Sequence, residues 1–173
     1  MKNLNIRQLS LLALFTALIV VTTMSISIPM IGTQGYVNVG DTMIFVTALL
    51  LGARAGAIAG GIGSALADIF LGYFHWAPWT LLIKGVEGLI VGVIGHASFA
   101  EHKRITLRSF LSLLAAVIWM VLGYYFAGGV MVGFSAAVSS VPGNLIQGGA
   151  GIVLSIPLVY LLRNLINRDS LGR

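Results

Sequence analysis

Two charged residues interrupt an apolar stretch in the middle of the chain. Lys84 and Glu87 follow Pro78, whose ring and missing N–H suit the first turn of a helix. Three positions apart on a helix, the two side chains share a face and can pair. Because an isolated charge is costly in hydrocarbon, such residues usually face the interior of a bundle or a wet cavity. The pair is therefore either a structural ion pair or a contact for a bound ligand.

Aromatic and polar residues outside this stretch offer contacts of another kind. His75 and Trp79 can stack on a planar ring, or they can form, with Trp76, an aromatic belt at the membrane interface. Tyr36 and Asn38, in an earlier loop, can likewise either contact a ligand or lie at the membrane interface. These residues are candidates for binding a flat solute.

Amide and carboxyl side chains extend the candidate site. Asn144 and Gln147 lie one helical turn apart, and their amides suit hydrogen bonds to a heteroaromatic solute. Asp41 is expected to cap the N-terminus of a helix. Asp68 is expected to bond a neighbouring helix or Lys84. A ligand contact stays open for both aspartates.

The sequence lacks the groupings that catalysis or metal binding requires. It contains no Gly-x-x-x-x-Gly-Lys-Ser/Thr loop for phosphate and no cysteine. His75, His96 and His102 are scattered, without the spacing of a metal site on a helix. We therefore expect neither an enzyme nor a metal or other cofactor.

Composition places these residues in a membrane protein. Of the 173 residues, 58% are hydrophobic and only 9% are charged, against about 25% charged residues in a soluble domain. We expect a single transmembrane domain over residues 1–173, anchored at the interface by Tyr124 and Tyr125. The net charge of +5 does not indicate nucleic acid, because the basic residues are dispersed between apolar runs.

The apolar runs predict an all-α bundle of about six transmembrane helices, since a span needs roughly 20 apolar residues. The first run is too long for the core of a cleaved signal peptide, so we interpret it as a retained span. The second run is short for a crossing. The expected spans are Leu9–Ile28, Asp41–Ala53, Ala55–Phe70, Pro78–Phe99, Leu107–Ala127 and Pro142–Leu162.

The basic residues indicate the orientation of this bundle. All of them except Lys84 fall on one side of the predicted membrane: Lys2, Arg7, Arg54, Lys103, Arg104, Arg108, Arg163, Arg168 and Arg173. The loops after the first, third and fifth spans contain no Lys or Arg. By the positive-inside rule both termini are cytoplasmic.

Polar residues inside the spans gather in the outer half of the predicted bundle. Asp68 and Lys84 lie toward the outer ends of their spans, and Asp41, Asn144 and Gln147 open theirs from the outside. An ion path would need polar groups through the full thickness of the membrane. The asymmetry therefore predicts a pocket that opens outward.

Small residues recur at intervals of four, which places each set on one helix face. Small faces let helices approach closely in lipid, so internal packing is the first expectation and a docking face for a partner subunit is the alternative. The sets are Gly52, Gly56, Gly60 and Ser64; Ala55, Ala59, Gly63 and Ala67; and the pair Ala13 and Ala17.

Several local patterns resemble the substrate-binding (S) components of energy-coupling factor (ECF) transporters, which take up vitamins in prokaryotes. Ala13-x-x-x-Ala17 matches the alanine motif by which these components dock on a membrane coupling subunit. Three further blocks are similar to those of the branch assigned to hydroxymethylpyrimidine, a thiamin precursor, or to pyridoxine-type substrates. They are Tyr36-Val-Asn-Val-Gly-Asp41, Gly60-Gly-Ile-Gly-Ser-Ala-Leu-Ala-Asp68 and Ile83-Lys-Gly-Val-Glu-Gly88.

The resemblance implies a multi-pass protein of the prokaryotic cell membrane that captures a small heteroaromatic vitamin from outside. The implied partners are a membrane coupling (T) subunit, which would be contacted by Ala13 and Ala17, and two ATPase subunits. Two alternatives stay open: a stand-alone secondary transporter or facilitator, and a structural subunit of a membrane complex without a ligand. The expected ligand contacts are Tyr36, Asn38, His75, Trp79, Lys84, Glu87, Asn144 and Gln147.

Overall fold

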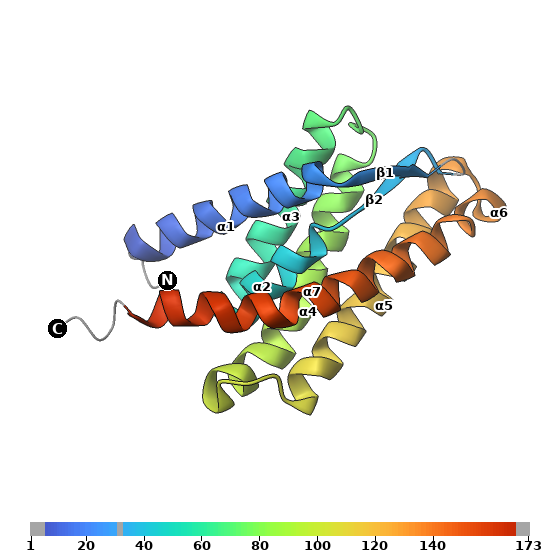
Figure 1. The fold of residues 1–173 in the computed structure, drawn as a ribbon. Coiled ribbons are helices and arrows are strands. Elements are labelled where there is room, and N and C mark those ends of the chain that lie inside the picture. The colour runs from blue at the N-terminus through green and yellow to red at the C-terminus, as the bar shows by residue number, and fades with distance from the viewer. Residues whose placement is uncertain (1–5, 31–32, 169–173) are drawn as a thin grey trace.

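Long apolar helices run side by side through the molecule, and a small β-hairpin crosses them near one end (Figure 1). The computed structural model describes residues 6–30 and 33–168, with the side chains of 164–168 excepted. The start of α1 and the end of α7 lie at the same end of the bundle (Figure 1). The elements are α1 (Ile6–Ser25), β1 (Ser27–Met30), β2 (Gly35–Asn38), α2 (Asp41–Leu51), α3 (Ala53–Phe70), α4 (Ala77–His102), α5 (Leu107–Val132), α6 (Phe134–Ala137) and α7 (Ser140–Arg168).

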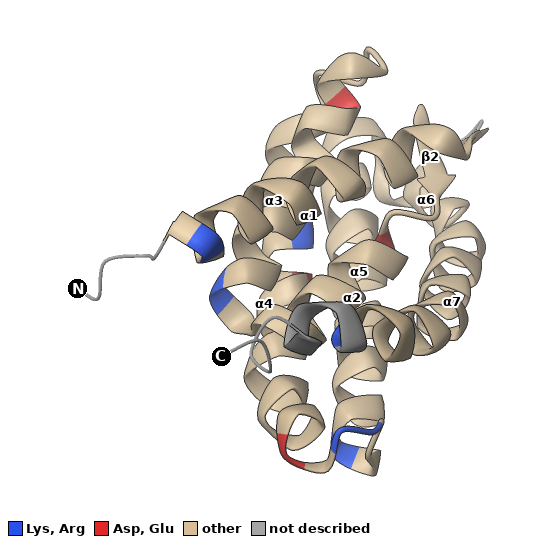
Figure 2. Ribbon diagram, turned by 60° about the vertical axis from the view of Figure 1, so that its left-hand side comes forward, with Lys and Arg blue, Asp and Glu red and all other residues tan. Residues whose placement is uncertain are grey.

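Length and composition qualify four helical segments to cross a membrane: Ile6–Ser25, Ala77–His102, Leu107–Val132 and Phe134–Arg163. Helices α1 to α5 and α7 overlap the six predicted spans in the sequence. Of these, α2 is short, with only 11 residues. Charged residues are sparse on the ribbon. Apart from one lysine in the interior, the basic residues lie toward the end of the bundle that holds the start of α1 and the α4–α5 connection (Figure 2).

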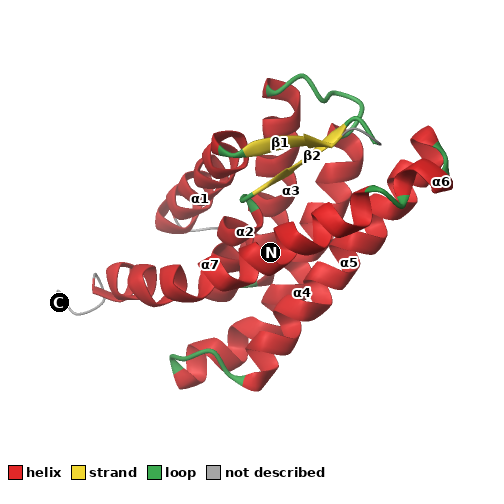
Figure 3. Cartoon of the chain, turned by 45° about the vertical axis from the view of Figure 1, so that its right-hand side comes forward, coloured by secondary structure: helices red, strands yellow, loops and turns green. Residues whose placement is uncertain are grey.

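The β-hairpin is the main departure from the prediction. The first span was predicted to continue to Ile28, but α1 ends at Ser25 and Ile28 lies in β1, paired with Val37 of β2. Pro29 prevents the helix from continuing, and the β-branched residues around it favour an extended strand. The segment predicted as a plain loop therefore forms an antiparallel pair that lies across the helices (Figure 3).

A glycine separates α2 from α3. Gly52 adopts a φ of +86°, a conformation that other residues rarely take, and its N–H closes the end of α2 on the Ala48 carbonyl. Two helices joined at this sharp break both pack against α4. The break thus places the two helices on either side of the polar residues of α4.

Small residues bring α3 and α4 into backbone contact, the most extensive helix pair in the fold. A Cβ atom added to Gly56 would lie 2.7 Å from the Gly88 carbonyl oxygen, and one added to Gly60 would lie 2.8 Å from the Lys84 carbonyl oxygen. Gly63 faces α1, where a Cβ would meet Ile19 at 2.9 Å. The expectation of internal packing is confirmed for these glycines, and it fixes the position of Lys84.

Candidate functional site

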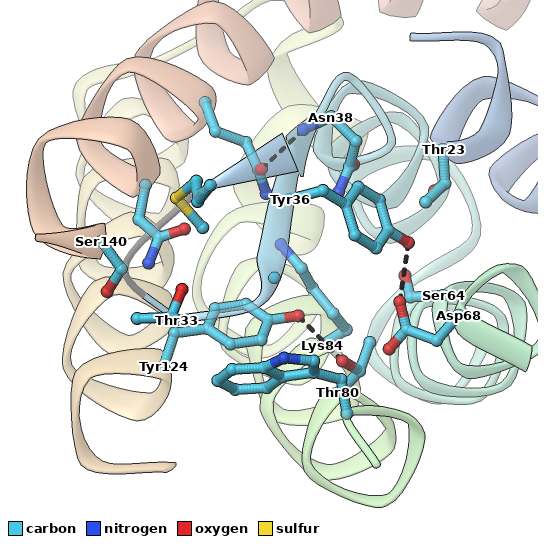
Figure 4. Close-up of a pocket in the computed structure, with 15 residues that line it drawn as sticks. Thr23, Thr33, Tyr36, Asn38, Ser64, Asp68, Thr80, Lys84, Tyr124 and Ser140 are labelled. Atoms are coloured by element: carbon cyan, nitrogen blue, oxygen red, sulfur yellow. Dashed lines mark hydrogen bonds between the residues drawn. The ribbon is translucent and has the colours of Figure 1, made fainter. Parts of the chain in front are cut away.

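A cavity lies beneath the β-hairpin, between the ends of α1, α3, α4, α5 and α7 (Figure 4). Its volume is about 30 Å³. Three aromatic rings and a set of polar side chains form its walls. The lining residues are Thr23, Met30, Thr33, Gly35, Tyr36, Asn38, Ser64, Asp68, Trp76, Thr80, Lys84, Tyr124, Ser140, Asn144 and Gln147.

A cluster of buried charges lies behind one wall of this cavity, and its lysine, Lys84, lines the cavity. Lys84 Nζ bonds Asp41 Oδ1 and lies 2.9 Å from Glu87 Oε2. All three side chains are at most 2% exposed. Glu87 follows Lys84 by one helical turn, and Asp41 is brought to it by the start of α2. Two carboxylates on one ammonium hold Lys84 in a fixed position, since each charge would be costly if left alone.

Gln147 ties this cluster to the hairpin. Its Nε2 donates to Asp41 Oδ2 at 3.0 Å, and its Oε1 accepts from the Asn38 backbone N–H at 2.8 Å. The Asn38 side chain accepts from the Gly40 N–H at 2.8 Å and so shapes the turn into α2. Because its two amide ends are both engaged, Gln147 serves to hold the hairpin against the bundle.

Aromatic side chains also line the cavity. Trp76, which is 5% exposed, packs edge-on against Tyr124, with ring centroids 5.8 Å apart. The Tyr124 hydroxyl donates to Thr80 Oγ1 at 3.2 Å. Tyr36 donates to Asp68 Oδ1 at 2.6 Å (Figure 4). Flat faces with fixed hydroxyl groups are suited to stacking on a ring-shaped solute.

Several buried polar atoms in this cavity have no hydrogen-bond partner among the described residues. They are Asp68 Oδ2, Asn144 Nδ2, Thr23 Oγ1 and Thr33 Oγ1. Buried polar groups in native proteins are nearly always paired. Their gathering in one cavity therefore marks it as a place for a polar ligand.

The cavity contains five of the eight residues that the sequence suggested as ligand contacts: Tyr36, Asn38, Lys84, Asn144 and Gln147. Glu87 lies behind Lys84 and reaches the site only through it. His75 is exposed and Trp79 is half-buried, and neither lines the cavity. Trp76, just before α4, and Thr80, one turn later, both face the cavity. Trp79 therefore lies on a different face of the helix.

Three sequence interpretations need correction. Asp41 was expected to cap α2, but Gly40 holds the cap position without a side-chain bond, and the Asp41 carboxylate instead pairs with Lys84. Trp76 and Tyr124 were expected at the membrane interface, but both line the cavity. In the first case the buried ammonium group of Lys84 attracts the Asp41 carboxylate away from the end of the helix. The positions of Trp76 and Tyr124 follow from the packing of α4 against α5, which the sequence alone does not show.

The two alanines of α1 are placed away from the site. Ala13 and Ala17 are exposed, whereas Phe15 and Ile19 on the other side of α1 are buried at 3% and 0% exposure. Ile19 is the residue that contacts Gly63 of α3. The alanine pair is therefore not used for packing among the residues that the structure describes.

Known proteins resemble this chain in sequence and in fold. The family model of the ECF-type riboflavin transporter S component matches residues 3–164. The thiamine precursor transporter HmpT of Lactococcus lactis subsp. cremoris (strain MG1363) is 31% identical over 163 residues, which are 94% of this chain and 91% of that protein. An uncharacterized protein of Pyrococcus woesei is 41% identical over 148 residues, covering 86% of this chain and 96% of the relative.

A solved structure, the S component of a bacterial ECF transporter, has the same fold. It aligns with a TM-score of 0.62 at 21% identity, over 96% of this chain and 98% of that one. The helical bundle and its apolar helices define a multi-pass membrane protein of a prokaryotic transport family, not an enzyme. The chain belongs to the family of S components of ECF transporters.

Proposed function

We propose that the chain is the substrate-capture subunit of an ECF-type importer, and that it binds a small heteroaromatic vitamin or vitamin precursor from outside the cell. The cavity under the hairpin carries this proposal, because it combines three aromatic walls with unpaired polar atoms in a buried space. Ligand pockets characteristically join apolar walls to a few placed polar groups.

The size of the cavity favours a single ring as the substrate. The family model carries the name of riboflavin, whereas HmpT is described as a transporter of a thiamine precursor. A volume of about 30 Å³ corresponds to roughly two water-sized spaces. A pyrimidine or pyridine, such as hydroxymethylpyrimidine or a pyridoxine-like compound, requires less rearrangement of these walls than a fused three-ring system. We therefore place the ring between Tyr36, Trp76 and Tyr124.

Entry of any ring into so small a cavity requires a wall to move, and the hairpin is the wall that packs least against the helices. It contacts α1 and α7 only lightly compared with the packing between the helices. Hydrogen bonds also hold it to the bundle, from Tyr36 to Asp68 and from Trp76 to the Gln34 carbonyl. The bond from Asn38 N–H to Gln147 is the hydrogen bond that links it to α7. We propose that β1 and β2 swing away from α7 to admit the substrate.

The orientation that we propose places this hairpin outside and both termini in the cytoplasm, with six passes in total. The short α2 is compatible with six passes. Its 11 residues span about 16 Å, and it begins beside Lys84, seven residues or about 10 Å below the start of α4. Strand β2 covers the missing outer part. Non-helical backbone at membrane depth is tolerated where protein buries it.

The proposed partners are a membrane coupling subunit, docked on the Ala13 and Ala17 face, and two ATPase subunits that drive release. The exposure of both alanines on a helix whose other side packs on α3 supports this docking face. Small exposed residues let a second helix approach closely in lipid.

Thermal unfolding of the purified, detergent-solubilised chain tests the capture role. The panel contains hydroxymethylpyrimidine, pyridoxine, thiamine and riboflavin. A ligand at 100 times its dissociation constant stabilises the folded state by about 2.7 kcal/mol. Stabilisation by a single-ring compound is the expected result. A shift with riboflavin alone would contradict the small-ring assignment, and no shift with any compound would favour a structural subunit. Uptake by vesicles that contain this chain alone would favour a stand-alone transporter.

A further inference from the structure

Asp68 presents a carboxylate oxygen to the cavity that no group in the described chain satisfies. The residue is 2% exposed and lies in the last turn of α3, which ends at Phe70. Its Oδ1 accepts from the Tyr36 hydroxyl at 2.6 Å, and its Oδ2 has no hydrogen-bond partner. A buried carboxylate with one free oxygen costs stability unless a donor reaches it.

Asn144 presents the complementary group from another wall. It is 2% exposed on α7, and its Nδ2 amide group has no hydrogen-bond partner among the described residues. It follows Ser140 on the same helix by one turn, and Figure 4 shows Ser140 and Asp68 on opposite sides of the cavity. The cavity therefore offers a free acceptor on one side and a free donor on the other.

Several of the other polar groups of the cavity are already engaged, whereas the Thr23 and Thr33 hydroxyls are free and can each donate or accept. Lys84 is paired with Asp41 and Glu87, and both ends of the Gln147 amide are bonded. Thr80 accepts from Tyr124. Its hydroxyl also lies close enough to interact with the Asp68 carboxylate, although Asp68 Oδ2 has no partner with hydrogen-bond geometry. The excess of buried carboxyl groups over ammonium groups also favours a ligand that donates a hydrogen bond. The buried charged residues of the described chain are three carboxyl groups and one ammonium.

We propose that Asp68 and Asn144 determine substrate specificity, with Asp68 accepting a hydrogen bond from an amino group on the ring and Asn144 donating one to a ring nitrogen. This rests on the proposed capture role and narrows the substrate class to amino-substituted nitrogen heteroaromatics. An exocyclic amino group on such a ring donates and does not accept, while an unprotonated ring nitrogen accepts and does not donate. Among the free groups of the cavity, the Asp68 oxygen is purely an acceptor and the Asn144 Nδ2 group purely a donor, and together they match this pair of functions.

The test compares two probes that differ only in the amino group. They are 4-amino-5-hydroxymethyl-2-methylpyrimidine and the same compound with hydrogen in place of the amino group. Calorimetric titration of the full chain in detergent gives the dissociation constant of each. The wild-type chain is expected to bind the amino compound about 10- to 100-fold more tightly, as a hydrogen bond to a charged group would give.

Variants at the two positions should act differently. Asp68→Leu removes the acceptor and is expected to lower the preference for the amino compound to about threefold or less, with the unsubstituted compound bound nearly as before. Asp68→Asn keeps the shape of the side chain and is expected to lower the same preference at least threefold; it carries the test if the leucine variant does not fold. Asn144→Leu is expected to weaken both probes alike, since both keep the ring nitrogens.

Tyr36→Phe provides the control for a purely structural role of Asp68. It removes the hydroxyl donor but leaves the carboxylate, so the preference for the amino compound should persist. If Asp68 only supports the fold, its variants will weaken both probes by the same factor, which overturns the inference.

Failure of this inference is distinguishable from failure of the capture role. Equal binding of both probes by the wild-type chain, or binding of pyridoxine and of neither probe, overturns the assignment of Asp68 and leaves capture of a ring compound standing. Absence of binding by every ring compound in the panel overturns both.

Discussion

Lys84 Nζ lies 2.9 Å from a carboxylate oxygen of Glu87, and both side chains are almost completely buried. Asp41 completes the cluster from the start of α2. Three charges buried in a membrane bundle would be costly individually, but each is placed against an opposite charge. The cluster joins α2 and α4 behind one wall of the cavity, so it couples the stability of the bundle to the shape of the site.

Lys84→Met is expected to destabilise the chain strongly, because it leaves two buried carboxylates without a cation. Breaking a buried ion pair in this way costs about 3–5 kcal/mol, which lowers the melting temperature by about 10 °C in a chain of this size. Glu87→Gln should cost less, since Asp41 still pairs with Lys84. Thermal unfolding in detergent measures both effects.

A triple variant provides the control for this prediction. Asp41→Asn, Lys84→Met and Glu87→Gln together remove all three charges, so the melting temperature should recover in part. Equal losses in the single and triple variants would show that packing around Lys84, rather than charge, is responsible.

The arrangement of helices was predictable from the sequence to a large extent. Apolar runs of about 20 residues and the one-sided basic residues indicate the helices directly, because the bilayer imposes a simple length rule. The hairpin escaped prediction because Ser27–Met30 and Gly35–Asn38 are only four residues each, and the apolar run before them continues without a charge. Short strands acquire their structure from pairing and from the helices beneath.

The candidate site was only partly predictable, for a related reason. Charged and amide residues in apolar runs are conspicuous, and Lys84, Asn144 and Gln147 do line the cavity. Aromatic residues give no such signal, since the same side chains serve at interfaces and in pockets. Whether Trp76 or Trp79 faces inward depends on the rotation of α4, which the glycine contacts with α3 determine.

Gly88→Ala and Gly149→Ala are expected to change stability in opposite directions. A Cβ atom at Gly88 would collide with the backbone of Gly56 on α3, so the helices must separate at a cost of about 1–3 kcal/mol. Gly149 is exposed on α7 with open space around it, and alanine there should stabilise the helix by about 0.5–1 kcal/mol. The melting temperatures of the two variants, compared with that of the wild-type chain, test both expectations. A stable Gly88→Ala variant would contradict the close approach of α3 and α4.

Ala13→Leu combined with Ala17→Leu is expected to leave thermal stability and ligand binding unchanged but to abolish co-purification with the coupling subunit. Both alanines are exposed on α1, so larger side chains there extend away from the described part of the chain but prevent close approach of a partner helix. Ala97→Leu is the matched control, because Ala97 is exposed on α4. Co-purification that survives the α1 variant and fails with the α4 variant would move the docking face to α4.

A disulfide between the hairpin and α7 is expected to control access to the cavity. A Cβ atom at Gly143 would lie 3.0 Å from Val37 Cγ1, which is compatible with the short Cβ–Cβ separation that a disulfide requires. The chain has no cysteine of its own, so Val37→Cys with Gly143→Cys introduces the sole thiol pair. Oxidation should tie β2 to α7 and slow the association of a single-ring ligand at least tenfold, and reduction should restore it.

The single-cysteine variants control for the added side chains, because neither can form the link within one chain. Ligand loaded before oxidation should also be released more slowly from the double variant, since a closed hairpin blocks exit as well as entry. Association and dissociation rates under oxidising and reducing conditions measure both effects. Unchanged rates in a chain shown to be fully cross-linked would mean that the substrate enters between the helices, and that the hairpin is a fixed wall of the cavity.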